Sequence, residues 1–143
     1  MPFRFLEDIV TADVAFESWG ATREEVFSSC AAALLATMVE ESEEVARSKE
    51  IQIHLEHEEL DLLLFALLNE LVFHKDAHKL LLHVDNVVIT ERDGMFHLET
   101  VARGEEIAPD RHKLLVDVKA ITLHRFALVQ NDNLWKATVV VDV

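Results

Sequence analysis

The sequence has few of the residues that form disulfide bonds or glycine-rich ligand-binding loops. Its 143 residues include one cysteine, three glycines, two prolines and no tyrosine. A single cysteine excludes an internal disulfide framework and favours a reducing compartment. Because the glycines at 20, 94 and 104 are isolated, neither a P-loop nor a Rossmann dinucleotide turn is present. Cys30 lies in an alanine-rich apolar run, and we expect it to be a small core residue.

Positive charge is scarce as well. Thirteen Lys and Arg residues stand against 27 Asp and Glu residues, for a formal net charge of −14. This balance makes contact with a phosphate backbone electrostatically unfavourable, so we expect no direct binding of RNA or DNA. The same charge favours association with a basic partner surface or with a divalent cation.

No apolar run is long enough to cross a bilayer. The longest, from Leu60 to Phe73, is interrupted by Asp61, Asn69 and Glu70 and is too short to span. The opening MPFRFLEDIV carries two acids and one arginine and does not have the pattern of a signal peptide. We therefore expect a cytoplasmic protein without membrane association, folded as a single domain over residues 1–143.

Hydrophobic spacing predicts two strands followed by a helix in the first third of the chain. FRFLE and DVAFESW have the alternation of strands. Thr22 and Glu25 have the spacing of a capping box, which predicts a helix from there to about Val39. KEIQIHLE is expected to be a further strand.

The remaining pattern predicts a second helix and then strands only. ELDLLLFALLNELVF is apolar on most of its circumference, so this helix should be enclosed on more than one side. Asp93-Gly94 and residues 131–133 predict the turns of two hairpins. The fold class is α+β, with two helices packed on mainly antiparallel β-sheet in the order β-β-α-β-α-β-β-β-β. The four predicted strands after the second helix are LLLHVDNVVITE, MFHLETVARG, LLVDVKAITLHRFALVQ and LWKATVVVDV.

Eight histidines raise the question of a metal site. His74 and His78 have i,i+4 spacing, but they lack the glutamate of the HExxH motif of zinc proteases. His54 and His57 precede the second helix, and strand alternation points His54 outward. We interpret these histidines as solvent-exposed.

Two strand-end aspartates form a better candidate site. Asp13 opens the second predicted strand, and Asp142 closes the last one beside Val143, so neighbouring strands could bring them together. Carboxylates and a free chain end offer hard oxygens, the ligands preferred by calcium and magnesium. On spacing alone, two ordinary strand-end aspartates remain the alternative.

Six motifs in order resemble the archease family, the small protein cofactors of the RtcB-type RNA ligase that joins tRNA halves after intron removal. They extend along nearly the whole chain. The motifs are TADV (11–14), WGATREEVFSSCAAAL, LDLLLFALLNELVF, GEEIAPDRHK, VKAITLH and the final VVVDV.

The resemblance implies a helper rather than an enzyme. Archeases speed guanylylation of the ligase's active-site histidine and allow multiple turnover, and they are associated with a bound divalent metal, calcium in the family's structural picture. Carried over by position, the metal ligands fall on Asp13, Asp142 and Val143. Lys119 matches a functional lysine of the family, which we place on the ligase-facing surface.

Two departures and two other functions qualify this resemblance. Val10 and Leu123 stand where the family commonly has His and Tyr, so a role that needs that imidazole or phenol is in doubt. The alternative function is a metal-dependent hydrolase that uses Asp13 and Asp142 with His124 as base. A further alternative is a chaperone-like module whose acidic face shields a basic partner.

Overall fold

The structure is a computed structural model that describes residues 2–6 and 13–143. Within these residues the fold class is α+β, as predicted, but five strands follow the second helix where four were predicted. The elements are β1 (Phe3–Leu6), β2 (Asp13–Gly20), α1 (Arg23–Met38), the 3₁₀ helix η1 (Ser42–Glu44), β3 (Lys49–His57), α2 (Leu60–His78), β4 (Leu80–His83), β5 (Val87–Arg92), β6 (Met95–Glu106), β7 (Ala120–Asn131) and β8 (Leu134–Asp142).

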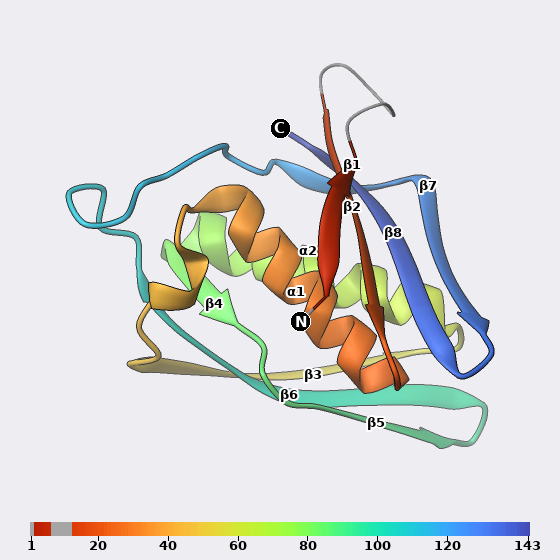
Figure 1. Cartoon of the computed structure of the whole chain (residues 1–143). Helices are drawn as coiled ribbons and strands as arrows, with labels where there is room; N and C mark the ends of the chain where they lie inside the picture. Colours follow the sequence, from red (N-terminus) through yellow and green to blue (C-terminus); the bar gives the residue numbers. More distant parts are fainter. Residues whose placement is uncertain (1, 7–12) are drawn as a thin grey trace.

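The strands form two antiparallel sheets with the helices between them (Figure 1). The first sheet has the order β1-β2-β8-β7, and the second has the order β3-β6-β4, with β5 also paired to β6. Helix α1 packs on β2 and on β5, and α2 packs on β7 and on β3, so each helix contacts both sheets. This middle layer explains why α2 is apolar on most sides, as the sequence predicted.

The predicted strand LLLHVDNVVITE is two strands, β4 and β5, both paired to β6. His83 pairs with Arg103 and Val87 pairs with Thr100, so residues 84–86 face the two residues 101–102. The extra residue is a β-bulge, a feature that hydrophobic alternation does not reveal. The Thr100 hydroxyl donates a hydrogen bond to the Asn86 carbonyl at this bulge.

The start of α1 confirms the predicted capping box. The Thr22 hydroxyl accepts a hydrogen bond from the Glu25 amide at 3.1 Å, and the Glu25 carboxylate accepts one from the Ala21 amide at 2.8 Å. The preceding Gly20 has no room for a side chain, because a Cβ there would lie 2.7 Å from the Val26 nitrogen. Cys30 is fully buried, as predicted, and burial raises the pKa of its thiol to about 12.

The C-terminal end of α2 is tied to the segment that leads into β7. Lys75 is buried, and its Nζ lies 2.6 Å from Asp117 Oδ1, from the Val118 carbonyl and from Asp76 Oδ1. Burial opposes the charged form, but the hydrogen bonds and ion pairs with Asp117 and Asp76 outweigh it and raise the pKa of Lys75. The prediction that His74 is solvent-exposed is wrong, since its side chain is only 12% exposed beside Glu70.

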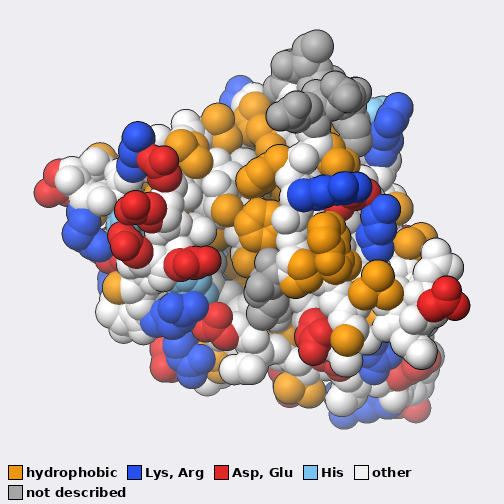
Figure 2. Space-filling view, in the orientation of Figure 1, with side chains coloured by type: hydrophobic (Ala, Val, Ile, Leu, Met, Phe, Trp, Pro, Cys, Tyr) orange, Lys and Arg blue, Asp and Glu red, His pale blue; other side chains and the backbone are white. Residues whose placement is uncertain are grey.

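The surface is mixed in character. In Figure 2, hydrophobic side chains gather over β1 and β2, and charged side chains of both signs surround them. Phe5 of β1 is 45% exposed. Of the helices in the described part of the chain, none combines the length and the apolar composition needed to cross a membrane.

Candidate functional site

The first sheet brings Asp13 and Asp142 together. They are direct partners in the antiparallel pairing of β2 and β8, and Asp142 also pairs with Ala120 of β7. Directly opposed residues in antiparallel strands project on the same face, with Cβ atoms about 4.5–5.5 Å apart. The side chain of Asp13 is half-buried and that of Asp142 is exposed. The proximity that the sequence left open is therefore present in the fold.

The backbone at this strand end is held in place from several directions. Val139, Val140 and Val141 of β8 are fully buried, and the Val143 side chain packs on the core. The Lys119 amide donates a hydrogen bond of 2.8 Å to the Asp142 carbonyl. Asp142 thus lies at a packed strand end between β2 and β7, with its side chain open to solvent.

The donor set at this end consists of oxygen atoms. Asp13 and Asp142 supply carboxylate oxygens, and Val143 follows Asp142 directly in the chain. Hard oxygen donors suit calcium or magnesium, and calcium takes about six to eight of them. Three residues leave coordination positions for water or for a partner's groups. Thr11 and Ala12 of the TADV motif, and also Val10, lie outside the described residues.

Lys119 lies beside this site through its backbone, and its side chain is exposed. Its neighbour Asp117 is paired with Lys75 instead. Among the described residues, no ion pair involves Lys119. Within the described part of the chain, the lysine that the resemblance singled out therefore has no ion-pair partner, and its backbone lies next to Asp142.

His124 is poorly placed to act as a base for the two aspartates. It lies four residues beyond Ala120 on β7, in the segment opposite Val139, which is three residues before Asp142 on β8. A bulge intervenes as well, because residues 123–126 face the single residue 139 and Arg125 adopts a positive φ of 55°. Leu123 and His124 are both exposed at this bulge, where β7 bends in Figure 1. This geometry disfavours the hydrolase alternative.

The GEEIAPDRHK segment contains a polar clamp that the sequence did not reveal. Glu105 is nearly buried and accepts a hydrogen bond from the Ala46 amide at 2.6 Å. It is also paired with Arg111, and it lies 3.1 Å from His112 Nε2. These contacts lower the pKa of Glu105 to about 2, and the hydrogen bond with Arg111 has the largest effect. The spacing between Glu105 near the end of β6 and Arg111 and His112 in the following loop was the signal that could have indicated the clamp.

Comparisons with known proteins match archeases along nearly the whole chain. The model of the Archease protein family matches residues 3–143. Protein archease of Methanothermobacter thermautotrophicus is 36% identical over 141 residues, covering 99% of this chain and 98% of the relative. Protein archease of Pyrococcus furiosus is 34% identical over 134 residues, covering 93% of this chain and 94% of the relative.

Solved structures have the same fold. The solution structure of protein 1598 of Methanobacterium thermoautotrophicum superposes with a TM-score of 0.85 at 35% identity, covering 99% of this chain and 98% of that one. A crystal structure of an archease from Thermotoga maritima, described as a possible chaperone, has a TM-score of 0.62 at 18% identity. The match covers 96% of this chain and 98% of that one, and it supports the fold alone. The family match and the identities establish that the chain belongs to the archease family.

Proposed function

We propose that this archease is a metal-binding protein cofactor of an RtcB-type RNA ligase in tRNA splicing and RNA repair. In this role it promotes guanylylation of the ligase and allows multiple turnover, in the cytoplasm and without binding RNA itself. The observation that carries the proposal is the direct pairing of Asp13 with Asp142 at the end of the first sheet. Membership of the archease family supports the choice of partner.

The pairing creates an electrostatic reason to bind a cation. Carboxylates on two directly opposed residues carry like charges and repel each other. A divalent ion between them replaces this repulsion with two attractions. Asp13, Asp142 and the main-chain oxygen of Val143 would hold the ion, and calcium fits this oxygen set best.

The incomplete coordination shell gives the ligase a way to engage the ion. Water would fill the open positions in the free protein, and oxygen groups of the ligase would replace some of that water in the complex. The exposed cation of Lys119, beside Asp142, would then face the ligase and contact one of its carboxylates or its nucleotide phosphates. The net charge of −14 suits a basic ligase surface around this point.

A reconstitution tests the proposal. Purified ligase, GTP and divalent metal are combined with this protein, and ligase–GMP formation is measured. Asp13→Asn and Asp142→Asn should each abolish stimulation, because they remove charge from the oxygen set without changing side-chain size.

Asp132→Asn is the matched control. Asp132 lies at the opposite end of the β7–β8 hairpin with a positive φ of 48°, a conformation that asparagine tolerates. This variant should stimulate as the wild type does. Full stimulation by Asp13→Asn and Asp142→Asn would exclude the aspartate pair from the mechanism. Turnover of a substrate by the protein alone would favour the hydrolase alternative.

A further inference from the structure

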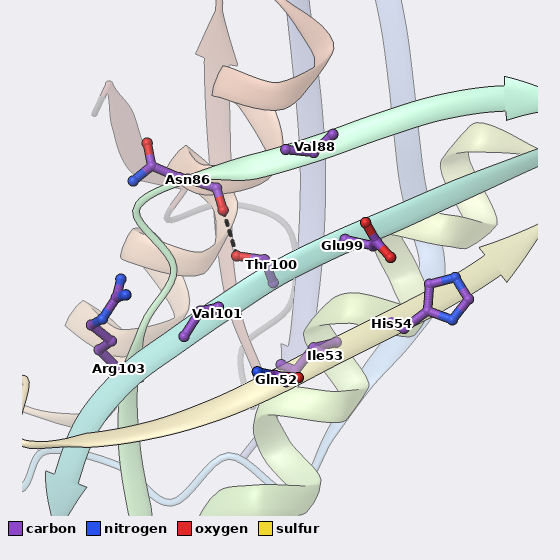
Figure 3. A pocket seen from close by; sticks show the side chains of 9 residues that line it. All are labelled: Gln52, Ile53, His54, Asn86, Val88, Glu99, Thr100, Val101 and Arg103. Carbon is purple, nitrogen blue, oxygen red and sulfur yellow. Dashed lines mark hydrogen bonds between the residues drawn. The ribbon is translucent and has the colours of Figure 1, made fainter.

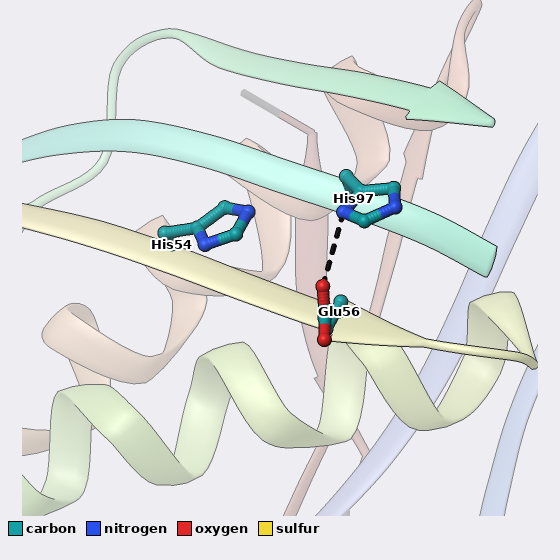
Figure 4. A group of neighbouring side chains, drawn as sticks. All are labelled: His54, Glu56 and His97. Atoms are coloured by element: carbon teal, nitrogen blue, oxygen red, sulfur yellow. Dashed lines mark ion pairs between the residues drawn. The ribbon is translucent and has the colours of Figure 1, made fainter. Parts of the chain in front are cut away.

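A second group of ligating side chains lies on the other sheet, far from the aspartate pair in the topology. His54 and Glu56 alternate on β3, and His97 lies opposite Glu56 on β6. All three project on the side of the sheet that faces away from the helices, because the residues that alternate with them, Ile53, Leu55 and Leu98, point to the core. Figure 4 shows the three side chains close together on this face.

The spacing of these groups suits one metal ion. One ligand atom from each of His54, Glu56 and His97 lies within 4.8 Å of the others. His97 Nδ1 and Glu56 Oε2 are 3.2 Å apart. Zinc bonds of about 2.0–2.1 Å in a tetrahedron place two ligand atoms about 3.4 Å apart. The distance between His97 Nδ1 and Glu56 Oε2 is already close to this value. The side chain of His54 is exposed, and its ring lies beside that of His97.

His97 faces the Glu56 carboxylate through a nitrogen that has no well-formed hydrogen bond. Its side chain is 14% exposed, and its Nδ1 is inaccessible and has no hydrogen-bond partner among the described residues. The same nitrogen lies 3.2 Å from Glu56 Oε2, so the two atoms face each other as potential ligands of one ion. A cation between them would satisfy both groups.

The ring of His54 lies almost parallel to that of His97, at an angle of 9° and with centroids 5.9 Å apart. Glu99 is opposite His54 in the strand register and is exposed on the same face. Four groups of metal-binding type are thus arranged as two cross-strand His–Glu pairs. Glu99 can serve as the fourth ligand or can orient His54.

We propose that His54, Glu56 and His97 bind a divalent transition metal of the zinc class. Imidazole is a ligand for zinc and its neighbours in the first transition row, whereas calcium and magnesium prefer oxygen. The site would therefore select a different ion from the oxygen set at Asp13 and Asp142. This inference does not depend on the proposed function.

The surroundings leave room to complete the coordination. His54 and Glu99 also line a hollow of about 650 Å³ on this face, with Gln52, Asn86 and Arg103 among its other walls (Figure 3). Arg103 is paired with Glu50, so its charge is partly compensated. An ion held by His54 would lie at the edge of this hollow, where water or a small ligand can occupy the open position.

Calorimetric titration with zinc, in excess calcium to occupy oxygen sites, tests the inference. The wild type should bind one zinc ion, and cobalt in its place should give the intense visible absorption of a tetrahedral site. Loss of an outer-shell partner costs about 10–100-fold in metal affinity, so His54→Asn and His97→Gln, which remove ligands, should each cost at least about 100-fold.

Two variants serve as controls. His124→Asn removes an exposed histidine of β7, and Asp142→Asn removes a carboxylate of the other sheet. Both should bind zinc as the wild type does. Equal zinc affinity in the wild type and in His54→Asn would overturn the site, as would loss of binding in His124→Asn. Circular dichroism checks the fold, and if His97→Gln unfolds, the exposed His54→Asn decides the question alone.

Discussion

The two sheets gather ligating side chains in different ways. In the first sheet, Asp13 and Asp142 meet at a strand end because the pairing of β2 with β8 sets their register. In the second, His54, Glu56 and His97 meet on an open face because strand alternation turns them outward together. The first set consists of oxygen donors and the second is mostly imidazole. The same rules of strand pairing thus gather two donor sets of different chemistry, and oxygen and imidazole donors suit different metals.

The two regions also differ in how firmly the rest of the fold holds them. The strand end at Asp142 is flanked by buried valines and by the backbone of Lys119. The histidine cluster is carried by side chains, of which His54 and Glu56 are exposed. We therefore expect the aspartate pair to depend on backbone register and the histidine cluster to depend on side-chain rotamers.

The largest expected effect is one that damages both regions together. Leu67 of α2 is fully buried in the helix layer between the sheets. Leu67→Ala should lower the free energy of unfolding by about 2–5 kcal/mol, because it leaves a cavity. Urea denaturation followed by circular dichroism measures the change. A loss below about 1 kcal/mol would mean that the layer repacks around the cavity.

An intermediate effect should separate the regions. Glu105→Gln removes the charge that holds Arg111 and His112, and should cost about 1–3 kcal/mol. Amide exchange should quicken in the loop between β6 and β7, whereas the β3–β6 pairs around His97 stay protected. Equal exchange throughout the loop in the two proteins would show that the clamp does not hold it.

The same residue predicts a pH dependence. The pKa of Glu105 falls from 4.5 to about 2 on folding, so the unfolded chain takes up the proton first as the pH is lowered. The stabilisation from the carboxylate is therefore complete above about 4.5 and is lost as the pH falls toward 2. Denaturation across this window should show a shallower fall in stability for Glu105→Gln. If stability fell equally steeply with pH in the wild type and in Glu105→Gln, the lowered pKa of Glu105 would be contradicted.

The smallest effect on stability is expected at Lys119. Its side chain is exposed, so Lys119→Ala should change the free energy of unfolding by less than about 0.5 kcal/mol. If it faces the ligase, loss of one charged contact should raise the concentration needed for half-maximal stimulation by about tenfold. Lys113→Ala, which removes a lysine paired with Glu40, is the control and should leave that concentration unchanged.

Much of the fold followed from local patterns. The capping box at Thr22 and the all-round apolar helix α2 were both read from spacing, and both depend on short-range geometry. The division into two sheets was not predictable in this way, because strand pairing between distant segments leaves no local signature. The bulge at 84–86 was missed for the same reason: alternation continues on both sides of it.

The candidate sites show the same limit. Asp13 and Asp142 were singled out by their places at strand ends, and only the strand order makes them neighbours. His54 was correctly expected to point outward, but its approach to His97 depends on the pairing of β3 with β6. His74 was wrongly placed in solvent, because nothing in its local sequence indicates that the helix end is covered.

Calorimetric titration with calcium tests the central claim most directly. The wild type and Asp132→Asn should each bind one calcium ion per chain, and Asp13→Asn and Asp142→Asn should bind none at the same concentrations. Retained stoichiometry and affinity in Asp142→Asn would contradict the account, because the ion would then be held without the pair that the strand register brings together.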